Sequence, residues 1–341
     1  MCRWNIQVLA TAAALAVATV ALAANANLNA PTGTQGLFLV DKVGAYLRFF
    51  DPKTFQEQAS FPVATNPHDF ALSPDHKYAY VPVYGDGVYG RNPHPGHEIL
   101  IVDLEAKKLM GTMDIAPYQA PHGIQIDSKG IVYVTCDISR KLLVIDPTNR
   151  KIVDAIDNEG TGHWIALLPD ASKIYVTNKT DKPYISVIDL KAKKVVARVP
   201  APGGSEGIAA SPDGKSVVAM DHAEPTMLVI DPKTDQVVDK VSLKGNTKGG
   251  YKVYYSADGK RVLTMSLTER LANIFDTANL HGEQKVLAVG KDPMGFAFSA
   301  DGKTALVANH GDGSVSVIDL DKGQVVKEFH AGTGIETLTY Y

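Results

Sequence analysis

Three histidines and two glutamates occupy the same place in a pattern that repeats along the chain. His68, His122 and His163 each precede a segment of alternating apolar and polar residues, and Glu206 and Glu336 stand at matched places further along. Imidazoles that converge with carboxylates suit zinc, copper or iron, with the carboxylates either binding the metal or orienting a histidine. The alternative is that each histidine hydrogen-bonds a neighbouring backbone group. A metal site therefore requires a fold that brings these five residues together.

The segments that follow these residues share one plan. Each has an alternating strand, a polar turn, a second alternating strand, a third strand that ends in Asp, and a fourth strand after another short turn. Six matched segments begin at Asp69, Gly123, Trp164, Gly207, Lys252 and Gly295. Four short antiparallel strands in a unit of about forty residues are typical of one β-propeller blade.

The two ends of the chain complete one further unit. Residues Glu336 to Tyr341 match only the first strand of the unit, whereas Gly36 to Val63 match only its last three strands. Pairing the two ends removes the exposed edge that an open array of blades would leave. The sequence therefore predicts an all-β protein over residues 27–341, a seven-bladed β-propeller of four-stranded antiparallel blades. Its ring is closed by the C-terminal strand joining the N-terminal strands.

In such a ring, the residue just before each innermost strand lies at the mouth of the central channel. Five consecutive blades supply, in order, Glu336, His68, His122, His163 and Glu206. The other two blades place Tyr251 and Met294 there, so the fold itself does not require histidine. We therefore predict that the five residues form a His/Glu arc that binds a metal ion or a small ligand.

The aspartates that end the third strands have a different explanation. They occur in every unit, as Asp51, Asp103, Asp146, Asp189, Asp231, Asp276 and Asp319. A residue present in all copies is best explained by the fold, and aspartate caps tight turns through a hydrogen bond to the backbone. We predict that these seven carboxylates form turns and have no catalytic role.

Other residues of interest lie at the same end of the ring. The step from His68 to His122 spans 54 positions, and its extra residues, Val83 to Glu98, predict a loop over the mouth or a tolerated surface insertion. Trp164 is expected to pack between blades, with stacking on a ligand as the alternative. Asp69 could support His68. Five further histidines are expected at this end: His94, His97, His222, His310 and His330.

Tyr175-Val176-Thr177-Asn178 is the tetrapeptide of the YVTN-repeat family, and two other units carry variants of it. The chain resembles that family of seven-bladed β-propellers over nearly its whole length. This resemblance implies the fold, whereas the activities of such proteins are diverse. A more distant likeness exists to the propeller domain of nitrous oxide reductase and to lactonase-like propellers. The chain lacks the cupredoxin-like cysteine and histidine cluster of the former.

The N-terminal segment predicts export. Residues 1–26 combine Arg3, an apolar run and small residues before a cleavage position, which indicates a signal peptide and a periplasmic or secreted mature chain without a membrane span. Cys136 would then be the only cysteine of the mature chain, expected as a buried, inert thiol. The formal charge of −3 and the absence of a basic cluster argue against nucleic acid as a partner.

Three classes of function remain open from the sequence. The first is a periplasmic metal-dependent oxidoreductase with copper, zinc or iron at the channel mouth. The second is a lactonase-like hydrolase or lyase, in which a cation or a His/Glu pair activates water or a substrate proton. The third is a non-catalytic scaffold that presents its channel-mouth face to a protein or a cofactor-bearing partner. No nucleotide-binding loop or motif for covalent haem attachment is present.

Overall fold

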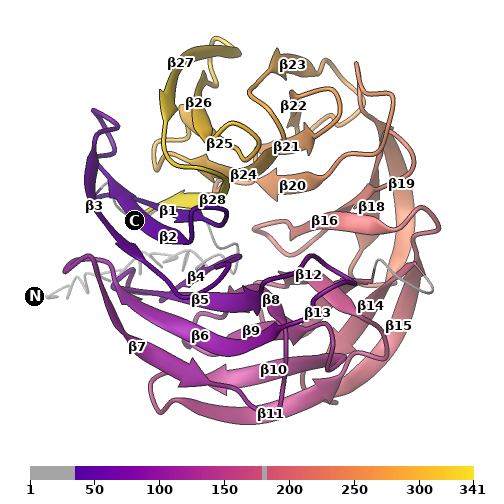
Figure 1. The fold of residues 1–341 in the computed structure, drawn as a ribbon. Helices are drawn as coiled ribbons and strands as arrows, with labels where there is room; N and C mark the ends of the chain where they lie inside the picture. Colours follow the sequence, from indigo (N-terminus) through magenta and orange to yellow (C-terminus); the bar gives the residue numbers. More distant parts are fainter. Residues whose placement is uncertain (1–34, 179–182) are drawn as a thin grey trace, which may run out of the picture.

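The computed structural model describes residues 35–178 and 183–341, in which 28 strands form seven four-stranded antiparallel sheets. The sheets stand side by side as the blades of a ring around a central channel (Figure 1). The predicted all-β, seven-bladed propeller is therefore confirmed. The predicted signal peptide, residues 1–26, lies outside the described residues.

The blades are numbered here along the chain, with strands given from the channel outward. Blade 1 contains β4 (Ala71–Leu72), β5 (Tyr78–Gly85), β6 (Pro95–Asp103) and β7 (Lys108–Asp114). Blade 2 contains β8 (Pro121–Ile126), β9 (Val132–Cys136), β10 (Lys141–Asp146) and β11 (Lys151–Asp157). Blade 3 contains β12 (Gly162–Leu167), β13 (Lys173–Asn178), β14 (Tyr184–Asp189) and β15 (Lys194–Pro200).

The second half of the ring has the same order. Blade 4 contains β16 (Ser205–Ala210), β17 (Val217–Asp221), β18 (Thr226–Asp231) and β19 (Gln236–Ser242). Blade 5 contains β20 (Lys252–Tyr255), β21 (Arg261–Ser266), β22 (Leu271–Asp276) and β23 (Lys285–Ala288). Blade 6 contains β24 (Pro293–Phe298), β25 (Thr304–Asn309), β26 (Ser314–Asp319) and β27 (Gln324–His330). The closing blade contains β28 (Ile335–Tyr340), β1 (Leu37–Asp41), β2 (Tyr46–Phe50) and β3 (Glu57–Pro62).

The closing blade joins the two ends of the described chain. Strand β28 pairs antiparallel with β1, with Leu338 opposite Leu39, and the two strands lie together in Figure 1 although they come from opposite ends of the sequence. Leu338 is fully buried in the core of this blade. The predicted closure is confirmed, because this pairing satisfies backbone groups that an open ring would leave exposed.

The strands of each blade become more exposed from the channel outward. The innermost strands β8, β12, β16 and β28 are buried at every residue, because they are covered by neighbouring blades on both faces. Outer strands such as β15 and β19 alternate between exposed and partly buried residues. Adjacent inner strands approach closely: a Cβ added to Gly123 of β8 would lie 2.5 Å from the carbonyl oxygen of His163 in β12. Glycine at this position allows that approach.

The third-strand aspartates form turns as predicted. Each accepts a hydrogen bond from a backbone amide two or three residues further along, in all seven blades. Within the described part of the chain there is also no long apolar helix of the kind that could span a membrane.

Candidate functional site

The five predicted site residues lie at one end of the channel, and each is buried. His122, His163, Glu206 and Glu336 are the second residues of β8, β12, β16 and β28, so they begin these strands instead of standing before them. His68 lies three residues ahead of the short strand β4, but its backbone amide still donates to the carbonyl oxygen of Pro82 in β5, 3.2 Å away. The shared position in the repeat therefore places all five at the channel mouth.

The three histidines form an unbroken row. The ring centroids of His68 and His122 are 3.9 Å apart, and those of His122 and His163 are 4.0 Å apart. The rings of each pair are tilted, by 49° and 36° respectively. The fold has thus brought together side chains that are 41 and 54 positions apart in the sequence.

A glutamate stands at each end of this row. Oε2 of Glu206 lies 3.0 Å from Nδ1 of His163, and Oε1 of Glu336 lies 3.7 Å from Nε2 of His68. The second oxygen of Glu336 faces Nζ of Lys42 at 3.6 Å and Nδ1 of His310 at 3.4 Å. The arc predicted from the sequence is therefore continuous from one carboxylate to the other.

Burial keeps the first two imidazoles uncharged. It is the main cause that lowers the pKa of His68 and of His122 well below the usual value of 6.5, and nearby positive groups, Lys42 among them, lower both further. The Nδ1 atoms of both rings have no hydrogen-bond partner among the described residues. Neutral imidazoles with an unused nitrogen are the form in which histidine binds metals.

A buried lysine and a buried aspartate lie near the row. Nζ of Lys252 sits 2.6 Å from the centroid of the Trp164 ring, and this ring in turn contacts His122 at a centroid distance of 4.9 Å. Burial lowers the pKa of Lys252 to about 8 and raises the pKa of Asp69 to about 7. Asp69 accepts hydrogen bonds from the backbone amides of Phe70 and Ile124. The predicted support of His68 by Asp69 is not seen as a hydrogen bond among the described residues, where Asp69 binds backbone amides instead.

The long loop of blade 1 reaches the row of histidines. The hydroxyl of Tyr89 donates to Oγ1 of Thr161 at 2.7 Å, and its ring centroid lies 4.2 Å from that of His163. His94 and His97 of the same segment are exposed and paired with Asp86 and Asp114. The loop thus covers the mouth through a tyrosine, and these two histidines are ordinary surface residues.

Sequence reasoning missed several residues of the site. Lys252 begins an inner strand where three other blades have glycine, so the matched-position argument that found the histidines could also have found it. Lys42, in contrast, follows β1 in a loop without a distinctive pattern. Tyr84, whose ring stands edge-on to His68 and His122, lies in β5 and reads as an ordinary strand residue.

The remaining expectations concern packing. Trp164 is buried against the histidine rings and Lys252, which agrees with the packing role. Cys136 is a buried free thiol whose pKa is raised by burial, as expected of an inert cysteine.

Among the described residues, no three or more His, Cys, Asp or Glu side chains are already arranged as a metal centre. Metal binding by the His/Glu arc therefore stays a prediction.

Comparison with known proteins agrees with this architecture. Residues 154–255 match the YNCE-like beta-propeller family. No curated protein is similar to the chain in sequence. The resemblance to repeat-built propellers predicted from the YVTN motif is therefore confirmed at the level of the fold.

Solved structures give the same result. A functionally unknown protein from Desulfotomaculum acetoxidans is 13% identical, with a TM-score of 0.72 over 88% of this chain and 98% of its own. Kuenenia stuttgartiensis hydrazine synthase is 19% identical, with a TM-score of 0.68 over 80% of this chain and 88% of its own. Dihydro-heme d1 dehydrogenase NirN in complex with DHE is 15% identical, with a TM-score of 0.66 over 90% of this chain and 75% of its own. At these identities the likeness shows the fold alone.

Proposed function

We propose that this propeller binds a copper, zinc or iron ion at the mouth of its central channel through His68, His122 and His163. Glu206 and Glu336 have supporting roles at the two ends of the row. One observation carries the proposal: three buried imidazoles touch one another between two buried carboxylates, although other blades accept tyrosine or methionine at the same position.

The donor set suits such an ion. Imidazole nitrogens with a carboxylate are ligands that zinc, copper and iron share. The free Nδ1 atoms of His68 and His122 are available for binding, and burial holds both rings neutral. Because the rings pack against one another, binding requires the histidine side chains to turn so that one nitrogen of each faces the ion.

The carboxylates would then position the ligands. Glu206 contacts Nδ1 of His163, which fixes the orientation of that ring and decides which nitrogen carries the proton. Glu336 lies farther from its histidine, 3.7 Å from Nε2 of His68, so it acts on that ring through its charge, and it also balances the charge of Lys42. Tyr89 lies against His163 and restricts the access of water from the loop side.

The broader role that we propose is a periplasmic oxidoreductase, in which the bound ion would supply redox chemistry. One structural neighbour is named a dehydrogenase, and this name supports the class. The proposed location follows from the signal peptide predicted over residues 1–26.

Elemental analysis tests the site. The full chain is purified after export, and a second sample is offered each metal after purification. We expect about one equivalent of copper, zinc or iron in the parent and none in a folded variant with His68→Ala, His122→Ala and His163→Ala. A parent that binds no metal above background in either sample would disprove the proposal.

A matched variant controls for the loss of three histidines. His94→Ala, His97→Ala and His281→Ala together remove three exposed imidazoles, each of which pairs with an aspartate. This control should keep the metal content of the parent, and equal loss in both variants would refute the assignment to the arc. If the triple variant at the arc does not fold, His122→Gln alone should weaken binding by about tenfold or more.

A further inference from the structure

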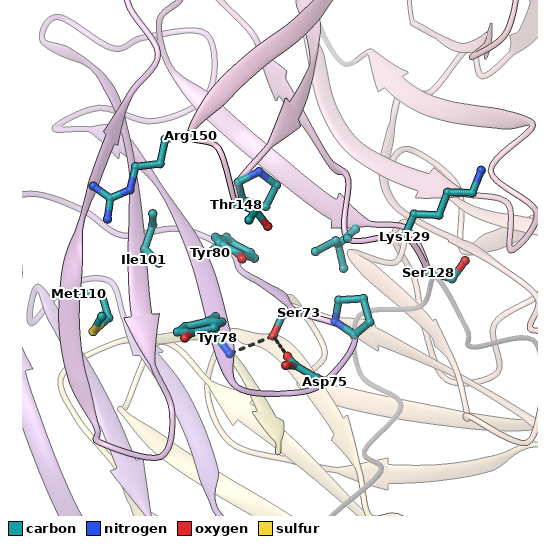
Figure 2. Close-up of a pocket in the computed structure, with 14 residues that line it drawn as sticks. Ser73, Asp75, Tyr78, Tyr80, Ile101, Met110, Ser128, Lys129, Thr148 and Arg150 are labelled. Carbon is teal, nitrogen blue, oxygen red and sulfur yellow. Dashed lines mark hydrogen bonds between the residues drawn. The ribbon is translucent and has the colours of Figure 1, made fainter.

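A second candidate site lies at the opposite end of the ring from the His/Glu arc. It is a groove of about 540 Å³ between blades 1 and 2, drawn in Figure 2. The turn of Ser73 and Asp75 between β4 and β5 lines it from blade 1, and the turns that carry Lys129 and Arg150 line it from blade 2. The volume is in the range of pockets that hold small organic molecules.

The walls of the groove are largely aromatic and apolar. Tyr78 and Tyr80 lie on the same face of β5, and Figure 2 shows them between Arg150 on one side and Lys129 on the other. Met110 of β7 adds an exposed thioether on the outer side. Burial raises the pKa of Tyr80 to about 12, so its hydroxyl remains a neutral hydrogen-bond donor. These walls suit a flat aromatic body.

The repeat supplies an internal comparison for this groove. Tyr80 pairs with Ala71 and Tyr78 with Asp103 in blade 1, just as Tyr175 pairs with Ala166 and Lys173 with Asp189 in blade 3. The neighbouring blade supplies a matched residue to each groove, Arg150 from blade 2 and Asp235 from blade 4. Each of the two is the fourth residue after a third-strand aspartate. Both have a left-handed backbone, with φ of 50° and 56°. The two grooves are therefore built from matched positions.

The matched groove between blades 3 and 4 is closed by its own side chains. Nζ of Lys173 lies 2.7 Å from Oδ2 of Asp235, and the hydroxyl of Tyr175 donates to the same carboxylate. In the groove between blades 1 and 2, Arg150 replaces that aspartate and Tyr78 replaces the lysine. The carboxylate that closes one groove is thus absent from the other, where a cation stands in its place.

Charge decides what kind of ligand would fit. Arg150 and Lys129 have no ion-pair partner among the described residues. The one acid of the lining, Asp75, already accepts from the hydroxyl of Ser73 at 2.7 Å and pairs with Lys77 at 3.4 Å. The groove therefore has unpaired positive charge beside two tyrosines.

We propose that this groove binds a small aromatic carboxylate, with the ring between Tyr78, Tyr80 and Met110 and the carboxylate on the guanidinium of Arg150. The planar fork of arginine matches a carboxylate through two parallel hydrogen bonds. The ligand would supply from outside the carboxylate that Asp235 supplies in the matched groove. This site is independent of the metal proposed at the channel mouth.

Titration of the full chain with 2-naphthoate tests the proposal. The NMR signal of the Met110 methyl group reports the binding. We expect saturable binding that shifts this signal, and binding about tenfold or more weaker for the neutral 2-naphthalenemethanol. No saturable binding, or equal binding of the neutral compound, would overturn the proposal.

Two charge-removing variants locate the contact. Arg150→Gln should weaken 2-naphthoate binding by about tenfold or more, because it removes the cation and leaves an uncharged polar side chain. Lys193→Gln removes a cation at the matched turn position of blade 3 and should leave binding unchanged. Equal weakening in both variants, or a saturable titration that does not shift the Met110 signal, would place the ligand elsewhere and disprove the site.

Discussion

Oδ1 of Asp41 accepts a hydrogen bond of 2.9 Å from the backbone amide of Gly334, which ties the end of β1 to the loop that precedes β28. The same carboxylate accepts from the amides of Thr333 and Gly44 and from Nε of Arg48. Burial acts to raise the pKa of Asp41, but these hydrogen bonds outweigh it and lower the pKa below the usual value. Asp41 is thus a charged link between the two ends of the ring.

Asp41→Ala should therefore lower the free energy of unfolding at pH 7 by about 2 to 5 kcal/mol, because the amides of Thr333 and Gly334 lose their acceptor, at about 1 to 3 kcal/mol for each buried group. A lowered pKa means that this stabilisation is present above pH ~4 and is lost as the pH falls through the folded-state pKa. Urea unfolding at pH 7 and pH 2 should show a smaller difference between parent and variant at pH 2. Glu57→Gln, which removes an exposed partner of Arg48, should change stability by less than about 1 kcal/mol.

Removal of residues 337–341 should strongly lower the unfolding temperature. The deletion takes most of β28 away from β1 and leaves β1 as an open edge. It also exposes the buried apolar side chains that pack against Leu338 and Tyr340 in the parent. Differential scanning calorimetry measures the effect, with Ser60→Ala in the outer strand β3 as a control that should keep the parent temperature. An unchanged unfolding temperature after the deletion would contradict the closure.

Asp189→Ala should cost only about 1 kcal/mol, the usual contribution of one local hydrogen bond. Oδ1 of Asp189 accepts from the amide of Ala192 at 2.7 Å, and this turn lies on the outer part of blade 3, away from the channel. Chemical denaturation gives the stability, and elemental analysis gives the metal content. Loss of metal from a well-folded Asp189→Ala protein would show that the turn aspartates serve the site after all.

Asp137 should titrate near pH 6. Burial raises its pKa to about 6, and the hydrogen bond of 2.6 Å from the hydroxyl of Tyr84 partly opposes this. Between about pH 4 and pH 6 the folded chain holds this proton and the unfolded chain releases it, so this group makes stability fall as the pH rises through that window. The carboxyl carbon signal in NMR measures the pKa directly.

Two substitutions test the cause of this shift. Tyr84→Phe removes the opposing hydrogen bond and should raise the pKa of Asp137 further. Asp137→Asn should gain stability relative to the parent as the pH rises from 4 to 7, by up to about 3 kcal/mol. A carboxyl that titrates near 4 in the parent would show that burial does not control this group.

The sequence by itself determined the repeat, the ring closure and the common place of the five arc residues. These follow from local signals: alternating strands, a turn aspartate in every unit, and a last segment that matches the one strand missing from the first unit. Once the blades are aligned, a ring brings equivalent positions to one axis. His68, His122 and His163 could therefore be grouped without coordinates.

Only the tertiary structure decided how the side chains meet. The ring contact of 3.9 Å between His68 and His122, and the position of Lys252 over Trp164, depend on the width of the channel and on side-chain directions. Arg150 and Tyr80 line one open groove from different blades, and no local pattern in the sequence links them. The alternation of a strand predicts which face of one blade is buried. Contacts between blades depend on how the side chains pack, and that packing forms only in the closed ring.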